Sequence, residues 1–235
     1  MLPVAMQGAQ RILVPGEVVA ERSGRRGVEV EGAVYRTDSQ YRAKTLSVAR
    51  YDERGEVLRV IPLKGKYIPS VGDIVIGIVV EVGFTSWLVD INSPYTAVLP
   101  VSEVSPRPVT IPRSDLSKIL DEGDLILAKV ISFDKTKDPV LTVKESKLGK
   151  IQRGLLVEIS PKKVPRVIGR KGSMIKLIES MLDTEVIVGQ NGRILVVGRD
   201  RRREEIAALV IKKIEAEAHT EGLTSRIKEY IEGML

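Results

Sequence analysis

The segment Gly169-Arg170-Lys171-Gly172 constrains the fold of this chain more than any other feature of its sequence. Two glycines three positions apart are common by chance, so any prediction from this segment depends on the flanking sequence. A short apolar stretch over 164–168 precedes the loop, and apolar residues recur at helical spacing over 174–182 directly after it. The pattern predicts two helices joined by a glycine turn.

Strands are predicted on both sides of this helix pair. The stretch Leu155–Ile159 precedes it, and Glu185–Val188 and Ile194–Val197 follow it, joined across Asn191-Gly192. An Asn-Gly pair between apolar runs is a strong signal for a two-residue hairpin. A second long helix follows, with Asp200 as its N-cap and Gly222 at its end, and a terminal helix begins at Thr224 or Ser225. The predicted order is strand, helix, loop, helix, strand, strand, helix.

The loop chemistry suits a phosphate. Glycine lacks Cβ, so an anion can approach the main chain closely, and the following helix presents free N–H groups and the positive end of its dipole. Arg170 and Lys171 add charge without reading sequence, and Lys162, Lys163 and Arg166 lie just upstream. The alternative is an ordinary helix–turn–helix joint with solvated basic residues.

Residues 70–147 predict a five-stranded OB barrel. Gly72-Asp73 and Gly123-Asp124 supply turn chemistry ahead of two of its strands, and a proline-rich loop over 106–112 followed by a short helix at 114–120 interrupts the series before the fourth strand. The predicted strands are Ile74–Glu81, Trp87–Ile91, Ala97–Leu99, Leu125–Ser132 and Val140–Lys144.

Residues 1–69 predict a small all-β domain. Val28 and Val30 alternate with glutamates, and the runs at 43–51 and 56–62 flank a turn at Asp52–Gly55. Nothing catalytic is visible in this part of the chain.

Composition excludes several classes of function. The 235 residues include no Cys and one His, His219, so disulfide frameworks, thiolate zinc sites, cysteine nucleophiles and multi-histidine metal centres are excluded. The longest apolar run, Ile74–Val80, is too short to span a bilayer, and residues 1–10 do not resemble a signal peptide. We therefore expect no catalytic residues, metal or cofactor, and a cytoplasmic location.

Charge is distributed unevenly along the chain. The net charge is +6, and it divides into +4 over residues 1–70, −3 over 71–149 and +5 over 150–235. Such a distribution points to an anionic partner bound mainly by the last third. The run Arg199–Arg203 is either a nucleic-acid patch or an exposed helical turn compensated by Glu204 and Glu205.

Two family resemblances follow from these motifs. Residues 150–220 resemble a KH domain of type I, βααββα, in which the GxxG loop clamps about four single-stranded nucleotides. Segments such as Val71-Gly72-Asp73 and 98–103 resemble RNA-binding domains of the ribosomal-protein-S-one type. That resemblance implies that barrel aromatics, here Trp87 and Phe84, stack on bases and that Phe133 and Lys129 join the same face. The alternative for both aromatics is the barrel core or a docking surface.

The order of modules resembles the RNA-binding cap subunits of the archaeal exosome. The resemblance implies an N-terminal β-domain (1–69) that docks on a ring of RNase-PH-like subunits, an S-one-type barrel (70–147) and a KH domain with a C-terminal helix (150–235). It implies a non-catalytic subunit that captures single-stranded RNA and delivers it to a 3′–5′ phosphorolytic chamber.

Two alternatives remain open from the sequence. A transcription or translation factor with one KH domain would bind nascent or ribosomal RNA with the same modules. A phosphorolytic nuclease would need a large catalytic core upstream, and 69 residues are too few for one.

Overall fold

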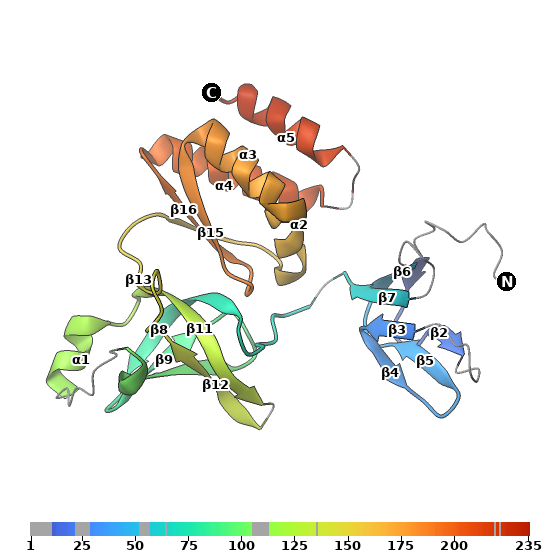
Figure 1. The fold of residues 1–235 in the computed structure, drawn as a ribbon, viewed down its shortest axis with the longest axis horizontal. Helices are drawn as coiled ribbons and strands as arrows, with labels where there is room; N and C mark the ends of the chain where they lie inside the picture. The colour runs from blue at the N-terminus through green and yellow to red at the C-terminus, as the bar shows by residue number, and fades with distance from the viewer. Residues whose placement is uncertain are drawn as a thin grey trace. The chain divides into compact units, whose positions relative to one another are not determined.

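The structure is a computed structural model, and it divides into two compact units, Met1–Gly65 and Lys66–Leu235 (Figure 1). Among the residues that it describes, no helix is long and apolar enough to cross a membrane. The expected turn at Asp52–Gly55, the proline-rich loop over 106–112 and His219 lie outside the described residues. The structure describes residues 11–21, 29–51, 57–63, 65–104, 113–134, 136–218, 220 and 222–235.

The described part of the first unit consists of two small sheets, in which the strand pairs are antiparallel except for the parallel pair β3–β7. One sheet has the strand order β1-β6-β7-β3, and the other has the order β2-β5-β4. Leu13, Ala43, Leu58 and Val60 are buried between them. The strands are β1 (Arg11–Leu13), β2 (Val18–Glu21), β3 (Glu29–Gly32), β4 (Val34–Arg36), β5 (Gln40–Ala43), β6 (Ser47–Tyr51) and β7 (Val57–Pro62).

The second unit begins with a closed barrel, as the sequence predicts. Its strands pair in the order β12-β10-β9-β8-β11, and β12 pairs again with β11 to close the barrel. The β10–β12 pairing is parallel and the other ladders are antiparallel. Gly72 and Gly123 take positive φ angles of 96° and 88° in the turns before β8 and β11. The elements are β8 (Ile74–Val82), β9 (Ser86–Asp90), β10 (Thr96–Pro100), α1 (Arg113–Ile119), β11 (Leu125–Asp134) and β12 (Lys137–Thr142).

The barrel begins earlier in the chain than residue 70. The Tyr67 ring is buried in the barrel core, and its hydroxyl donates to Asp73 Oδ2 at 2.6 Å. Burial, together with this hydrogen bond, raises the pKa of Tyr67. The structure therefore assigns 66–69, the predicted end of the first domain, to the barrel.

The third module has the βααββα order of a type I KH domain. Its sheet has the strand order β14-β16-β15, and α2, α3 and α4 pack on one face of it around Val167, Ile178, Ile194 and Val210. The elements are β14 (Leu155–Glu158), α2 (Val164–Ile168), α3 (Ser173–Leu182), β15 (Thr184–Val188), β16 (Arg193–Gly198), α4 (Arg201–Ala216) and α5 (Leu223–Glu232). The short strand β13 (Gly149–Lys150) pairs with β11 just before this domain.

Helix ends follow the predicted signals in part. The Asp200 side chain accepts from Arg203 N at 2.9 Å, which confirms it as the N-cap of α4. Gly222, with φ of 65°, stands at the start of α5 rather than at the end of α4, which ends at Ala216. Helix α5 buries Leu223, Ile227 and Ile231 in the KH core.

The second face of the KH sheet packs on the barrel. Leu195 from β16 is buried against Ile76 and Leu127 of the barrel. Both domains therefore share a core, and Figure 1 shows the β15–β16 end directed at the barrel.

The predicted two-residue hairpin at Asn191-Gly192 is wrong. Strand β15 ends at Val188 and β16 begins at Arg193, so the loop has four residues, and only Gly192 takes a positive φ, of 84°. Asn191 is fully buried; its Nδ2 donates to the carbonyls of Ile76 and Ile91 at 2.7 and 3.0 Å. Asn191 thus serves docking between the domains, whereas Gly192 alone has the backbone conformation of a turn.

Arg193 completes this junction between KH domain and barrel. Its side chain is only 5% exposed, and its guanidinium contacts Asp90 Oδ2 at 2.5 Å and Glu158 Oε1 at 2.8 Å. Its Nη1 also donates to the Asp90 carbonyl at 2.6 Å. One buried cation therefore ties a barrel strand to two KH strands.

Candidate nucleic-acid interface

The GxxG loop has a conformation that its two glycines permit. Gly169 takes φ 74° and ψ 173°, and Gly172 takes φ 76° and ψ 14°. A Cβ on Gly169 would lie 2.8 Å from Met174 N and 2.9 Å from Met174 Cβ, so a larger residue is excluded there. A Cβ on Gly172 would meet nothing within 4 Å. The first glycine lets the chain fold back on α3, and the second faces open space.

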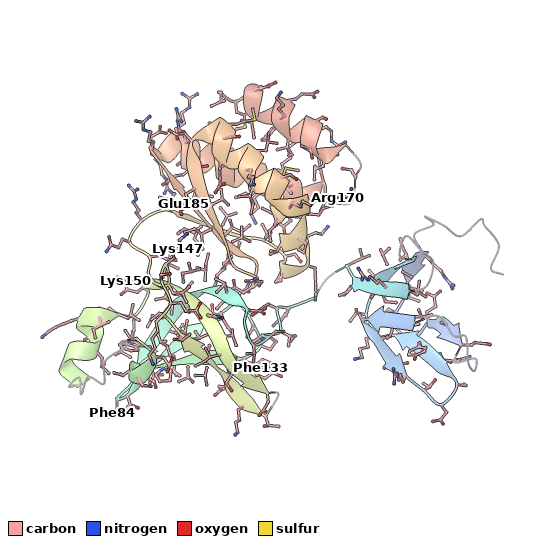
Figure 2. All side chains as sticks on the ribbon, in the orientation of Figure 1. Phe84, Phe133, Lys147, Lys150, Arg170 and Glu185 are labelled. Carbon is pink, nitrogen blue, oxygen red and sulfur yellow. The ribbon has the colours of Figure 1, made fainter. Side chains whose placement is uncertain are left out.

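The loop leads directly into the N-terminus of α3. The first N–H groups of a helix lack intrahelical acceptors, and no side chain caps α3 at Gly172. Arg170 and Lys171 are exposed, and Figure 2 shows Arg170 where α2 meets α3. This is the arrangement that the sequence predicts for a phosphate site.

The segment 159–178 contains six Lys or Arg residues and no Asp or Glu. Among the described residues, no carboxylate lies within ion-pair distance of any of the six. Their charge is therefore uncompensated within the part of the chain that the structure covers. The six are Lys162, Lys163, Arg166, Arg170, Lys171 and Lys176.

Arg166 differs from the other five cations. Its Nε donates to the Ala218 carbonyl at 2.6 Å, which ties α2 to the segment after α4. Glu217, next to Ala218, accepts from Lys213 and Arg226, and these two cations hold the pKa of Glu217 below its usual value. Arg166 thus has a structural contact in addition to the RNA contact predicted for it.

The second basic run, 199–203, is largely neutralised. Arg199 and Arg203 both lie near Asp183, at 3.6 and 3.5 Å, and Arg201 pairs with Glu205 at 3.2 Å. Arg203 Nη1 also donates to the Leu182 carbonyl at the end of α3. These contacts favour the compensated-helix alternative over a nucleic-acid patch.

Trp87 lies in the barrel interior rather than on an exposed face. Its side chain is fully buried, and Nε1 donates to the Leu120 carbonyl at 2.9 Å. The structure therefore confirms the alternative for this residue, a place in the barrel core. Inward and outward positions alternate along β9, and Trp87 occupies an inward one.

The other two predicted barrel residues lie at the surface. Phe84, in the turn between β8 and β9, is 71% exposed, and Figure 2 shows it well apart from Arg170. Lys129 pairs with Glu145 at 2.7 Å, which neutralises its charge. Among Trp87, Phe84 and Lys129, Phe84 is the residue with an exposed aromatic ring that can stack on a base.

The structure pairs Phe133, which the sequence places on the exposed barrel face, with Tyr95, which the sequence pattern does not single out. Tyr95, just before β10, and Phe133 on β11 meet edge to face with ring centroids 4.9 Å apart. Both rings are half-buried. Their partnership depends on barrel closure, so no local pattern predicts it. Among the described residues, no group of three or more His, Cys, Asp or Glu side chains is placed to hold a metal ion.

Comparisons with known proteins agree with this architecture. Residues 66–132 match the family model described as RRP4, S1 domain, and residues 154–200 match a KH domain. A protein named exosome complex component Rrp4 from Thermofilum pendens is 63% identical over 226 residues, 96% of this chain and 94% of that protein. One of the same name from Aeropyrum pernix is 44% identical over 229 residues, again 96% and 94%. A solved structure of an exosome complex RNA-binding protein matches with a TM-score of 0.68 at 49% identity, covering 72% of this chain and 97% of that one.

Proposed function

The chain belongs to the Rrp4 family of exosome components, and from this premise we propose that it is a non-catalytic subunit that binds single-stranded RNA through its KH loop. In this proposal the subunit caps an exosome ring in the cytoplasm and passes RNA to a 3′–5′ phosphorolytic chamber formed by other subunits.

One observation carries the RNA-binding proposal. The open loop at 169–172 stands at an uncapped helix N-terminus, inside a segment whose six cations lack carboxylate partners among the described residues. Unpaired cations and free N–H groups bind phosphate regardless of base. The loop therefore supplies affinity with little sequence preference.

A double charge reversal tests this role. Arg170→Glu with Lys171→Glu removes two charge-assisted contacts, each worth about 1.5 kcal/mol, so affinity for a single-stranded RNA should fall about 100-fold. Fluorescence anisotropy with a labelled RNA measures it. Arg199→Glu with Arg201→Glu changes the net charge equally at two cations that have carboxylate partners, and it should alter affinity less than about threefold. Equal losses in the two double variants would reject the loop as the phosphate site.

The first unit supplies the contact with the ring in this proposal. Ile12 on the edge strand β1 and Val14, directly after this strand, are 65% and 54% exposed. Leu46, which precedes the partner of Leu13 on β6, is 42% exposed. Clustered exposed apolar side chains are typical of protein-binding surfaces. RNase-PH-like subunits are the partners that we propose for this surface.

Co-purification tests the docking surface. The full chain with Ile12→Glu and Val14→Glu should no longer capture RNase-PH-like subunits, while its RNA affinity stays unchanged. Capture of polymerase or ribosomal components by the unaltered chain, in place of ring subunits, would favour a transcription or translation factor instead.

The barrel contributes stacking through Phe84 in this proposal. A base stacked on an aromatic ring is worth about 1–3 kcal/mol, so Phe84→Ala should weaken RNA binding about tenfold without destabilising the barrel. Trp87→Ala should have a different effect: it should destabilise the barrel by about 3–5 kcal/mol, because that side chain is buried in the core.

A further inference from the structure

Glu179 lies on the same face of α3 as the GxxG loop. Gly172, Ile175, Lys176 and Glu179 are spaced at i, i+3, i+4 and i+7, which places them along one side of a helix. Seven residues of helix span about 10 Å. A strand clamped at the loop over about four nucleotides can therefore extend along this side of α3 to Glu179.

The Glu179 carboxylate reaches the main chain of β15. Its Oε1 accepts from Val186 N at 3.0 Å. Strand β15 ends the sheet order β14-β16-β15, so one of its edges has no strand partner among the described residues. Gly189 N donates to the Arg193 carbonyl across the hairpin. Because N–H directions alternate along a strand, the N–H groups of odd-numbered β15 residues point toward β16, and the N–H of Val186 points away from it. Glu179 thus occupies the open edge of the KH sheet.

The charge of Glu179 is also unusual for its position. It is the first acidic residue after the acid-free segment 159–178, and among the described residues no cation pairs with it. A carboxylate beside a phosphate path weakens RNA binding by repulsion. It also places a strong hydrogen-bond acceptor where a base would lie.

We propose that Glu179 is a specificity-determining residue of the KH domain that favours cytosine over uracil at the nucleotide lying on α3. The inference rests on the proposed RNA-binding function of the loop. With Oε1 held by the Val186 N–H, Oε2 is left to accept from an exocyclic amino group, as carboxylates accept from cytosine N4. Uracil presents a carbonyl oxygen at that position, and two acceptors facing each other repel.

The test compares two pyrimidines of equal size on the full chain. Hexamers of oligo(C) and oligo(U) RNA are titrated against the unaltered protein and against Glu179→Gln. The unaltered protein should bind oligo(C) at least about fivefold more tightly, the lower bound for one good base contact. In Glu179→Gln the amide can donate as well as accept, so the ratio should fall below about twofold, mainly through tighter oligo(U) binding.

A matched control is available next to the contact. Glu185 is exposed on β15 (Figure 2), and its side chain lies on the opposite sheet face from that of Val186 because strand side chains alternate. Glu185→Gln removes the same charge, so it should keep the oligo(C) preference. Glu179→Gln retains an acceptor for Val186 N, and its thermal midpoint should match that of the control.

Two results would overturn the inference: an unaltered protein with equal affinity for both hexamers, or a Glu179→Gln variant that keeps the oligo(C) preference. Failure of the proposed function is distinguishable. In that case Arg170→Glu with Lys171→Glu binds both hexamers as the unaltered chain does, or the unaltered chain binds neither. If only the role of Glu179 is wrong, that double variant loses both hexamers alike.

Discussion

The segments 162–176 and 193–203 carry six and five Lys or Arg side chains, yet they use these charges in opposite ways. In the first segment, no cation has a carboxylate partner among the described residues. In the second segment, four of the five arginines have carboxylate partners; Arg202 is the exception. Both segments belong to the same KH domain.

The difference shows that local cation density does not identify an RNA-binding surface. The arginines of 193–203 meet Asp90, Glu158, Asp183 and Glu205, which come from other strands and turns or from the next helical turn. The segment 162–176 lies in an acid-free stretch, and its charge stays available to solvent. We therefore expect the first segment to set RNA affinity and the second to set stability.

Within these two segments, the largest effect on stability is expected at Arg193. Arg193→Ala leaves Asp90 and Glu158 without their cation and removes a buried side chain from the junction. Because the two carboxylates are 42% and 55% exposed, the loss falls at the lower end for a broken buried pair, about 3 kcal/mol. Urea unfolding measures it. Arg170→Ala should change the free energy of unfolding by less than about 0.5 kcal/mol. Similar losses for both variants would contradict the proposed difference between the two segments.

A smaller loss is expected at Arg203. Arg203→Ala removes the bond to the Leu182 carbonyl and the exposed pairs with Asp183 and Asp200, which together are worth about 1 kcal/mol. The unfolding free energy should fall by this amount while RNA affinity stays the same. A variant with unchanged stability and weaker RNA binding would show that Arg203 contacts RNA instead.

Lys171 should trade stability against binding. Its φ of 53° lies in the left-handed region, so Lys171→Gly should raise the free energy of unfolding by about 0.5 kcal/mol and weaken RNA binding several-fold. Lys147 is the matched control, because it is exposed and takes a φ of 75° outside the loop. Lys147→Gly should give the same gain in stability with unchanged RNA affinity.

The smallest effect is expected at Glu217, beside the Arg166 contact. Lys213 and Arg226 lower the pKa of Glu217 in the folded chain, so the ionised form stabilises the fold above its usual value of 4.5, and that stabilisation is lost as pH falls through the lower folded value. Glu217→Gln should therefore lower the melting temperature slightly at pH 7, and the difference from the unaltered chain should disappear in strong acid. A difference that persists there would assign the effect to packing.

Local patterns predicted the elements well and the partners poorly. Turn glycines, helical spacing and the Asp200 cap are properties of neighbouring residues, and the structure confirms the five-stranded barrel and the βααββα order. The role of Asn191 was missed because its amide bonds to Ile76 and Ile91, about a hundred residues away. No pattern within the hairpin contains that information.

The aromatic residues make the same point for the candidate site. Trp87 and Phe84 are both aromatic and three positions apart, yet one is fully buried and the other is 71% exposed. Strand alternation and the turn at 83–85 decide between them. Likewise, Lys129 was expected to face RNA, but its pairing with Glu145 depends on where the chain runs after β12.

The slope of log affinity for single-stranded RNA against log salt concentration tests the central claim most directly. Each phosphate neutralised on a single strand contributes about 0.7 to that slope. Arg170→Gln with Lys171→Gln should reduce it by about 1.4, whereas Arg199→Gln with Arg201→Gln, at two paired arginines, should leave it unchanged. Equal slopes in the two variants, or a reduction only in the second, would show that the unpaired cations of 162–176 do not hold the RNA backbone.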